Sequence, residues 1–229
     1  MELRQIIGNT WCLYGHQLIP LYRTDSTHCI LLDTGASALR QDIVDTLEQN
    51  GLTPIGLLCT HTHFDHFGNA RYLSERYHCP VALPLGEAEI CRTLASVKSH
   101  LFVFTAGQVE NDPEMSEIPC LVDHVIRPEE TDTLFRGVRF RVLHTPGHSE
   151  GSVTLLCGDT LFCGDTLFAG SCGRTDFPGG SMKQMMASLA RLAALPGDYR
   201  VLPGHMEPST LDRERRFNPY MQMALREQG

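Results

Sequence analysis

The segment HTHFDH, residues 61–66, limits what this chain can fold into more than any other feature of the sequence. It directly follows the apolar run PIGLLCT, which predicts a short buried strand that ends where the polar side chains begin. In an extended stretch alternate side chains share a face, so His61, His63 and Asp65 are expected to point together, and His66 joins them if the backbone turns. Imidazole and carboxylate groups are good ligands for zinc, iron and manganese. The segment therefore predicts a metal site.

Three further polar residues follow apolar, strand-like runs downstream. His148 lies in TPGHSEGS, Asp165 in LFCGDTLFAG and His205 in LPGHMEPS. Each follows a glycine at the end of its run, and ligand groups converge at strand ends without burying loops in the core. A single PGH motif is typical of a turn histidine, but its repetition together with HTHFDH favours one shared metal centre.

The motif GDTLF occurs at 158–162 and again at 164–168, so the pattern alone does not distinguish Asp159 from Asp165. Asp159 lies between two apolar runs, where Gly-Asp is typical of a hairpin turn. The return strand then brings Asp165 back to the edge that holds His148. A strand of about five or six residues separates its two ends by roughly 17–20 Å. Asp165 is therefore the predicted ligand and Asp159 the predicted turn residue.

Strand-like and helix-like segments alternate along the chain, which predicts an α/β (α+β) fold forming a single domain over residues 1–229. A long loop or lid is expected at 97–120, where Phe102 and Phe104 either cover the site or anchor the loop to the core. The expected elements are strands at 28–35, 54–61 and 79–84, helices at 37–51, 69–77 and 86–95, a β-rich region from 123 to 170, a helix at 181–194 and a strand at 199–205.

Composition restricts the partners of the chain. Apolar residues make up 42% and charged residues 20%, as in ordinary globular proteins, and the formal net charge is -8. An acidic chain disfavours nucleic acid, so a small-molecule substrate is expected. Apolar runs of roughly 20 residues are absent, and the start MELRQIIGNTW lacks the features of a secretion signal. No membrane association and a cytoplasmic location are therefore expected, while the oligomeric state is left open.

The nine cysteines form no CxxC pair and are expected to be buried, reduced thiols.

Taken together, HTHFDH, TPGHSEGS, GDTLFAG and PGH resemble the metallo-β-lactamase superfamily over nearly the whole chain, and LLDTG at 31–35 matches its early strand and turn. GDTLFAGSCGRTDFPGGS at 164–181 is similar to the glyoxalase II-like (hydroxyacylglutathione hydrolase) branch and to its relatives, the persulfide dioxygenases. The resemblance implies a four-layer αββα sandwich with its site at one edge of the two sheets. Glyoxalase II itself carries a C-terminal helical domain that holds glutathione, and residues 206–229 are too few for one. Glutathione binding is therefore left open.

The resemblance also implies two divalent metal ions, zinc by preference, with iron or manganese as alternatives. The implied ligands are His61, His63 and His148 for the first ion, Asp65, His66 and His205 for the second, and Asp165 bridging both. Such a pair lowers the pKa of a shared water to roughly 7. The expected function is a hydrolase whose bridging hydroxide attacks a thioester, ester or amide carbonyl, with Asp65 also holding the nucleophile.

Other functions remain as alternatives. The first is a mononuclear iron sulfur (persulfide) dioxygenase that uses His61, His148 and Asp165. A β-lactamase-like or lactonase activity is the second, and a non-enzymatic metal-binding protein is the third. Structural zinc sites usually close with four ligands, so a set of seven disfavours the last.

Two further residues have alternative roles. Arg174 either contacts a substrate carboxylate or forms an ion pair with Asp176. Asp33 either orients a ligating imidazole or hydrogen-bonds its own turn.

Overall fold

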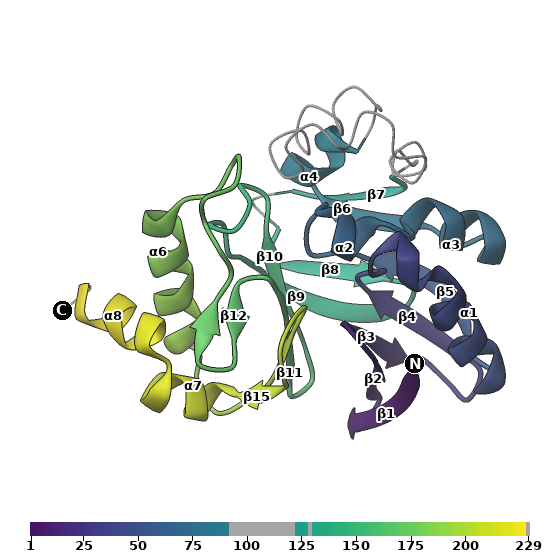
Figure 1. The fold of residues 1–229 in the computed structure, drawn as a ribbon, viewed down its shortest axis with the longest axis horizontal. Coiled ribbons are helices and arrows are strands. Elements are labelled where there is room, and N and C mark those ends of the chain that lie inside the picture. Colours follow the sequence, from purple (N-terminus) through teal and green to yellow (C-terminus); the bar gives the residue numbers. More distant parts are fainter. Residues whose placement is uncertain (92–121, 128–129, 228–229) are drawn as a thin grey trace.

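The computed structural model describes residues 1–91, 122–127 and 130–227, so the expected lid at 97–120, with Phe102 and Phe104, lies outside the described residues. Two β-sheets face each other, and helices cover the outer side of each (Figure 1). This is the expected αββα arrangement. The N-terminal part of the chain supplies the first sheet and its helices, and the C-terminal part supplies most of the second pair of layers.

The first sheet is seven-stranded and mixed, with antiparallel pairing from β1 to β4 and parallel pairing from β4 to β7. Its strands are β1 (Glu2–Ile7), β2 (Thr10–Tyr14), β3 (Leu18–Arg23), β4 (His28–Leu32), β5 (Thr53–Leu58), β6 (Val81–Pro84) and β7 (His124–Ile126). Parallel neighbours need a crossover connection, and helices supply it between β4 and β5 and between β5 and β6. Because these central strands are covered on both faces, they are continuous apolar runs.

The second sheet is six-stranded, and only its β11–β14 pair is parallel among the pairs described. Its strands, in order across the sheet, are β15 (Ser209–Thr210), β14 (Arg200–Pro203), β11 (Thr160–Gly164), β10 (Val153–Cys157), β9 (Val138–His144) and β8 (Asp132–Phe135), and β12 (Leu167–Phe168) pairs with β13 (Ser171–Cys172) beside it. Cys157 pairs with Thr160 across the β10–β11 hairpin, which leaves Gly158 and Asp159 in the turn. Gly158 has a φ of +56°, which favours glycine. The predicted hairpin is confirmed.

The helices follow the apolar periodicity of the sequence. The described ones are η1 (Ser37–Leu39), α1 (Arg40–Gln49), α2 (Phe64–Phe67), α3 (Ala70–Tyr77), α4 (Leu85–Ile90), α6 (Met182–Ala193), α7 (Leu211–Phe217) and α8 (Pro219–Glu227). In α1, Ile43, Val44 and Leu47 form the buried face. At the start of α6, the side chain of Ser181 accepts a hydrogen bond from the backbone N–H of Gln184, which caps the helix.

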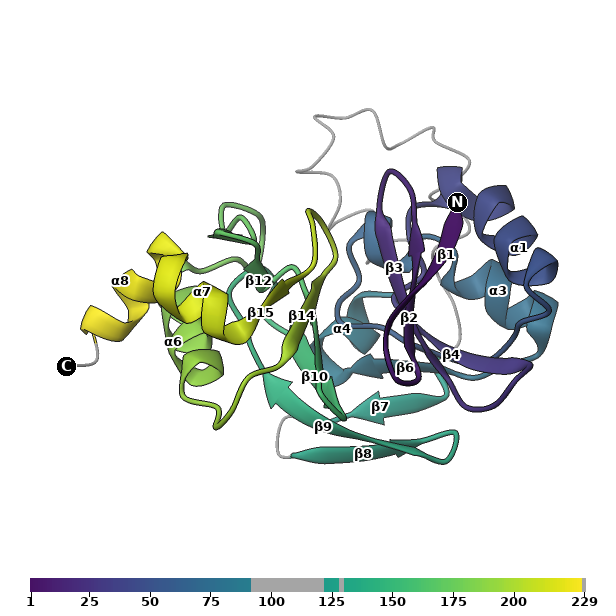
Figure 2. The same ribbon diagram turned by 90° about the horizontal axis from the view of Figure 1, so that it is seen from below.

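Three apolar clusters hold the layers together, and Figure 2 shows the sheets between the helices on either side. Neighbouring residues of β5 divide between two clusters: Leu57 packs with α1 and α3, whereas Leu58 packs between the sheets, because strand side chains alternate. Phe140 of β9 joins Leu58 in the inter-sheet cluster. The third cluster lies between the second sheet and α6 and α8, and includes Leu189 and Met221. The histidine and aspartate side chains described below follow strands of both sheets.

Several elements are not among those predicted, including β1–β3, α2, β15, α7 and α8. The residues of β1 are mostly exposed, and α7 has the sequence LDRERRF, so neither displays a clear apolar face. Eight of the nine cysteines are described, and all eight are free thiols; seven are buried as predicted, whereas Cys172 is half-buried. Burial raises the pKa of Cys12 and Cys163 to about 12. Within the described ranges, no helix has the length and apolar character needed to span a bilayer.

Candidate metal centre

The ends of strands from both sheets meet at one edge of the sandwich. Asp33 follows β4 and His61 follows β5, and these two strands are parallel neighbours. In the second sheet, Asp165 follows β11 and His205 follows the parallel strand β14. His148 lies in the loop between β9 and β10. Parallel pairing therefore brings ligand-type residues that are distant in sequence to the same edge.

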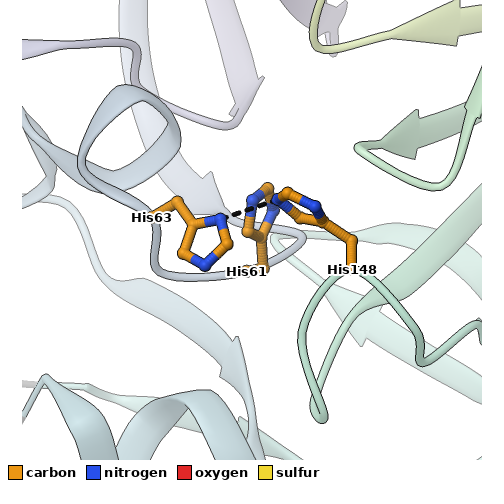
Figure 3. A group of neighbouring side chains, drawn as sticks. All are labelled: His61, His63 and His148. Atoms are coloured by element: carbon orange, nitrogen blue, oxygen red, sulfur yellow. Dashed lines mark hydrogen bonds between the residues drawn. The ribbon is translucent and has the colours of Figure 1, made fainter. Parts of the chain in front are cut away.

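His61, His63 and His148, here called the histidine half, lie together below the surface (Figure 3). Their ligand atoms are all within 4.8 Å of one another, and Nδ1 of His63 is 2.7 Å from Nε2 of His148. Among the residues that the structure describes, no hydrogen-bond partner faces the buried Nε2 of His61. A buried imidazole nitrogen aimed at two other rings, without a partner of its own, fits a metal ligand.

Hydrogen bonds on the far side of the rings fix two of these imidazoles. Nδ1 of His61 is 3.0 Å from Oγ1 of Thr60, and Nδ1 of His148 donates to the carbonyl oxygen of Arg174 at 2.7 Å. With Nδ1 engaged in this way, Nε2 of each ring is the nitrogen left for a metal. The partner of His148 is not visible in the sequence pattern, because a backbone carbonyl carries no residue signature.

Asp65, His66 and His205, here called the aspartate half, form a second group whose ligand atoms also lie within 4.8 Å of one another. Nε2 of His205 is 2.9 Å from Oδ2 of Asp65. Nδ1 of His66 is 2.8 Å from Oδ2 of Asp33, so Asp33 orients this imidazole. This half is more open: the side chains of His205 and Asp65 are 37% and 25% exposed.

The structure corrects one prediction about HTHFDH. Asp65 does not share an extended face with His61 and His63, because helix α2 begins at Phe64. The backbone N–H of His66 donates to the carbonyl of His63 at 2.8 Å, which starts the helical turn. The turn places Asp65 and His66 with His205, and His66 also stays beside His61, with their ring centroids 4.1 Å apart.

Asp165 faces both halves. Its Oδ1 is 3.1 Å from Nε2 of His66, and its Oδ2 is 3.4 Å from Nε2 of His148 and 3.6 Å from Nε2 of His205. Asp159 lies exposed in the hairpin turn at the other end of β11. The structure therefore places Asp165, and not Asp159, between the two groups.

Burial makes the histidine half electrically neutral. Burial and the neighbouring histidine rings lower the pKa of His61 well below its ordinary value and that of His63 to about 3. Burial likewise lowers the pKa of His148, although the Asp165 carboxylate opposes the shift. Neutral imidazole is the form that binds metal.

Carboxylates reverse this shift in the aspartate half. Burial disfavours a charged His66, but the carboxylates of Asp165 and Asp33 outweigh it and raise its pKa well above the ordinary value. The hydrogen bond to Asp65 raises the pKa of His205. Burial alone would raise the pKa of Asp65, yet the contacts with His205 and His66 hold it below its usual range.

Two positions beside the ligand residues have room only for glycine, because a side chain there would collide with neighbouring atoms. A Cβ on Gly204 would lie 2.1 Å from Cε1 of His66 and 2.7 Å from Oδ1 of Asp165. A Cβ on Gly173 would lie 1.9 Å from the backbone oxygen of Asp165. The glycine that precedes His205 in PGH thus marks a close approach of backbone to ligand, as well as a turn.

Arg174 takes the second of its two expected roles. Its guanidinium donates to Asp176 at 2.6 and 2.7 Å, and its side chain is 59% exposed. The guanidinium also lies 3.9 Å from the ring centroid of Phe177, and that ring is 5.8 Å from the ring of His63. Phe177 is a neighbour of the centre that the sequence pattern did not single out.

The metallo-beta-lactamase superfamily profile matches residues 18–205, so the chain belongs to this superfamily and has its metal-dependent hydrolase fold. An uncharacterized protein of Mycobacterium tuberculosis is 31% identical over 211 residues, which cover 86% of this chain and 88% of that protein. The probable metallo-hydrolase YqgX of Bacillus subtilis is 30% identical over 210 residues, covering 84% of this chain and 87% of that protein.

Solved structures agree with this assignment. BLEG-1, a B3 metallo-beta-lactamase, superposes with a TM-score of 0.76 at 29% identity and covers 90% of this chain and 94% of its own. TTHA1623 in a di-iron-bound form gives a TM-score of 0.72 at 34% identity, covering 91% and 98%. ETHE1 from Myxococcus xanthus gives a TM-score of 0.68 at 23% identity, covering 94% and 89%, and shares the fold.

Proposed function

We propose that this protein is a hydrolase with a dinuclear metal centre that cleaves a thioester, ester or amide bond. One observation carries the proposal: six ligand-type side chains lie in two adjoining groups of three, which His61 and His66 link, and the Asp165 carboxylate faces both groups. Two cations close to each other need a shared anion between them, and Asp165 is placed to supply it. Seven ligands also exceed the four of a closed structural zinc site.

The chemistry follows from what the centre and the chain each supply. When bound, a pair of divalent ions polarises a carbonyl oxygen and lowers the pKa of a water from near 16 to roughly 7. Asp65 is the residue placed to orient the attacking water, because its carboxylate stays ionised and part of its side chain faces solvent. His205 holds that carboxylate in place through its 2.9 Å contact.

The identity of the metal is part of the proposal. The three buried imidazoles and the mixed aspartate–histidine group suit zinc, and iron or manganese accept the same donors. The di-iron-bound form of TTHA1623, at 34% identity, supports iron as the leading alternative to zinc. The B3 metallo-beta-lactamase relative supports hydrolysis of a carbonyl compound.

An iron-dependent sulfur dioxygenase would use His61, His148 and Asp165 around one ion. That arrangement gives no metal role to the aspartate half, although its three ligand atoms also lie within 4.8 Å of one another. The dinuclear hydrolase is therefore the better explanation of the geometry.

Metal analysis combined with a substrate panel tests the proposal. Protein purified without added metal, then supplied with zinc, is expected to hold two ions per chain and to hydrolyse at least one of a set of acyl thioesters, esters, lactones and β-lactams. One tightly bound iron, with no second ion after zinc is supplied and with oxygen consumed in the presence of a persulfide, would instead establish the dioxygenase.

A further inference from the structure

A buried carboxylate outside the predicted ligand set links the two loops that form the histidine half. Glu87 lies in the first turn of α4 and is 1% exposed. Its Oε2 accepts hydrogen bonds from the backbone N–H of Thr62 at 3.0 Å and from the Thr62 hydroxyl at 2.5 Å. Its Oε1 accepts from the Ser149 hydroxyl at 2.6 Å and from the backbone N–H of Gly151 at 3.1 Å.

Each oxygen of Glu87 therefore serves one ligand loop. Thr62 stands between His61 and His63, in the loop after β5 of the first sheet. Ser149 directly follows His148, in the loop that enters β10 of the second sheet. One carboxylate thus ties together the protein segments that carry all three histidines, across the boundary between the sheets.

The surroundings are shaped for this contact. A Cβ on Gly151 would lie 2.7 Å from Cγ and 2.8 Å from Oε1 of Glu87, so the glycine leaves room for the carboxylate. The Ser149 hydroxyl also lies 2.6 Å from the Ser152 hydroxyl, which fixes its direction. Four hydrogen bonds from neutral donors satisfy the two oxygens of the Glu87 carboxylate. A buried carboxylate is costly unless such bonds satisfy it.

We infer that Glu87 is a positioning residue for the first metal: it sets the separation between the loop of His61 and His63 and the loop of His148. The inference rests on the metal centre proposed above. A purely apolar contact would hold the loops together without fixing their register, whereas four directed hydrogen bonds fix both distance and orientation. Partners of this kind typically change metal affinity by about 10–100-fold when they are lost.

The test compares Glu87→Gln with Glu89→Gln, an exposed position on the same helix. Glutamine keeps the size of the side chain but turns an NH₂ group toward one loop, where it meets hydrogen-bond donors. Zinc affinity is measured by chelator competition, the cobalt(II) absorption spectrum reports the ligand geometry, and the melting temperature of the metal-free protein reports the fold. Glu87→Gln is expected to weaken binding of the first ion by about 10–100-fold and to alter the cobalt spectrum, while Glu89→Gln matches the wild type.

The outcomes separate the two proposals. Unchanged zinc affinity and an unchanged cobalt spectrum in Glu87→Gln would overturn the positioning role, even if the melting temperature falls. A wild-type protein that binds neither ion would overturn the proposed function itself.

If Glu87→Gln does not fold, Thr62→Val and Ser149→Ala each remove one donor from a different loop. Both are then expected to weaken the first ion several-fold, and unchanged affinity in both would reject the inference.

Discussion

The two halves of the candidate centre hold similar ligands in opposite electrostatic settings. The histidine half is buried, its pKa values are lowered, and a hydroxyl and a backbone carbonyl orient two of its rings. The aspartate half opens to solvent, its two imidazoles have raised pKa values, and carboxylates surround them. Neutral rings can accept a cation directly, whereas protonated rings must first release a proton. We therefore expect the histidine half to bind the first ion and the aspartate half the second.

Removing the shared ligand should have the largest effect, because it acts on both halves. Asp165→Asn keeps the shape of the side chain but removes the negative charge between the two cations. We expect activity to fall by at least about a hundredfold and metal content to drop. Asp159→Asn is the matched control, because asparagine serves a turn nearly as well as aspartate. A metal-poor, inactive Asp159→Asn beside an active Asp165→Asn would contradict the ligand assignment.

Single-ligand variants should next separate the halves. His205→Ala removes one ligand of the aspartate half and leaves the histidine half complete. Elemental analysis is expected to find one ion per chain in place of two. His61→Ala should weaken even the first ion, by more than about tenfold. Two ions retained in His205→Ala would show that the halves do not bind ions separately. His28→Ala, at a surface ion pair, is the control and should change neither the number of bound ions nor the affinity for the first ion.

The pH dependence of metal content should differ between the halves. The raised pKa values of His66 and His205 mean that protons compete with the second ion increasingly as the pH falls. The pKa of His63, about 3, means that protons do not compete at that ring above about pH 5. Dialysis at fixed free zinc from pH 8 to pH 5.5 is expected to remove the second ion first. Loss of both ions over the same pH range would contradict the expected difference in proton competition between the halves.

The smallest expected effect comes from Asp33→Asn, which acts directly on His66 and, through the hydrogen bonds that Asp33 accepts from Thr60, indirectly on His61. Asp33 has a positive φ of 67°, a conformation that asparagine tolerates, so the backbone should be unchanged. The variant leaves His66 with a neutral partner in place of a carboxylate. We expect affinity for the second ion to fall by about tenfold, with the first ion affected less. Stepwise zinc titration measures both, and an effect on the first ion alone would reassign Asp33.

The strand ends and residue types were enough to predict the fold class and to single out the side chains that meet at the centre. The hairpin register that distinguishes Asp159 from Asp165 was also predictable, because turn chemistry and strand length are local properties. The helical turn at Phe64 was not, because four residues do not show a 3.6-residue period.

The supporting contacts of the centre depend on the tertiary fold. The backbone carbonyl of Arg174 accepts a hydrogen bond from His148, although the two residues are far apart in sequence and share no motif. The side chain of Arg174 bonds to a different residue, Asp176. Glu87 resembles any other helix glutamate until α4 is packed against the His148 loop. Contacts of this kind become predictable only once the two sheets are placed against each other.

Each half of the centre takes residues from both sheets: His61 and His63 join His148, and Asp65 and His66 join His205. A bound ion would therefore act as a cross-link between segments that are far apart in the chain. An ion held only by the native state shifts the folding equilibrium toward that state by mass action. We expect loss of metal to lower resistance to proteolysis as well as activity, with the first cuts where the two sheets separate.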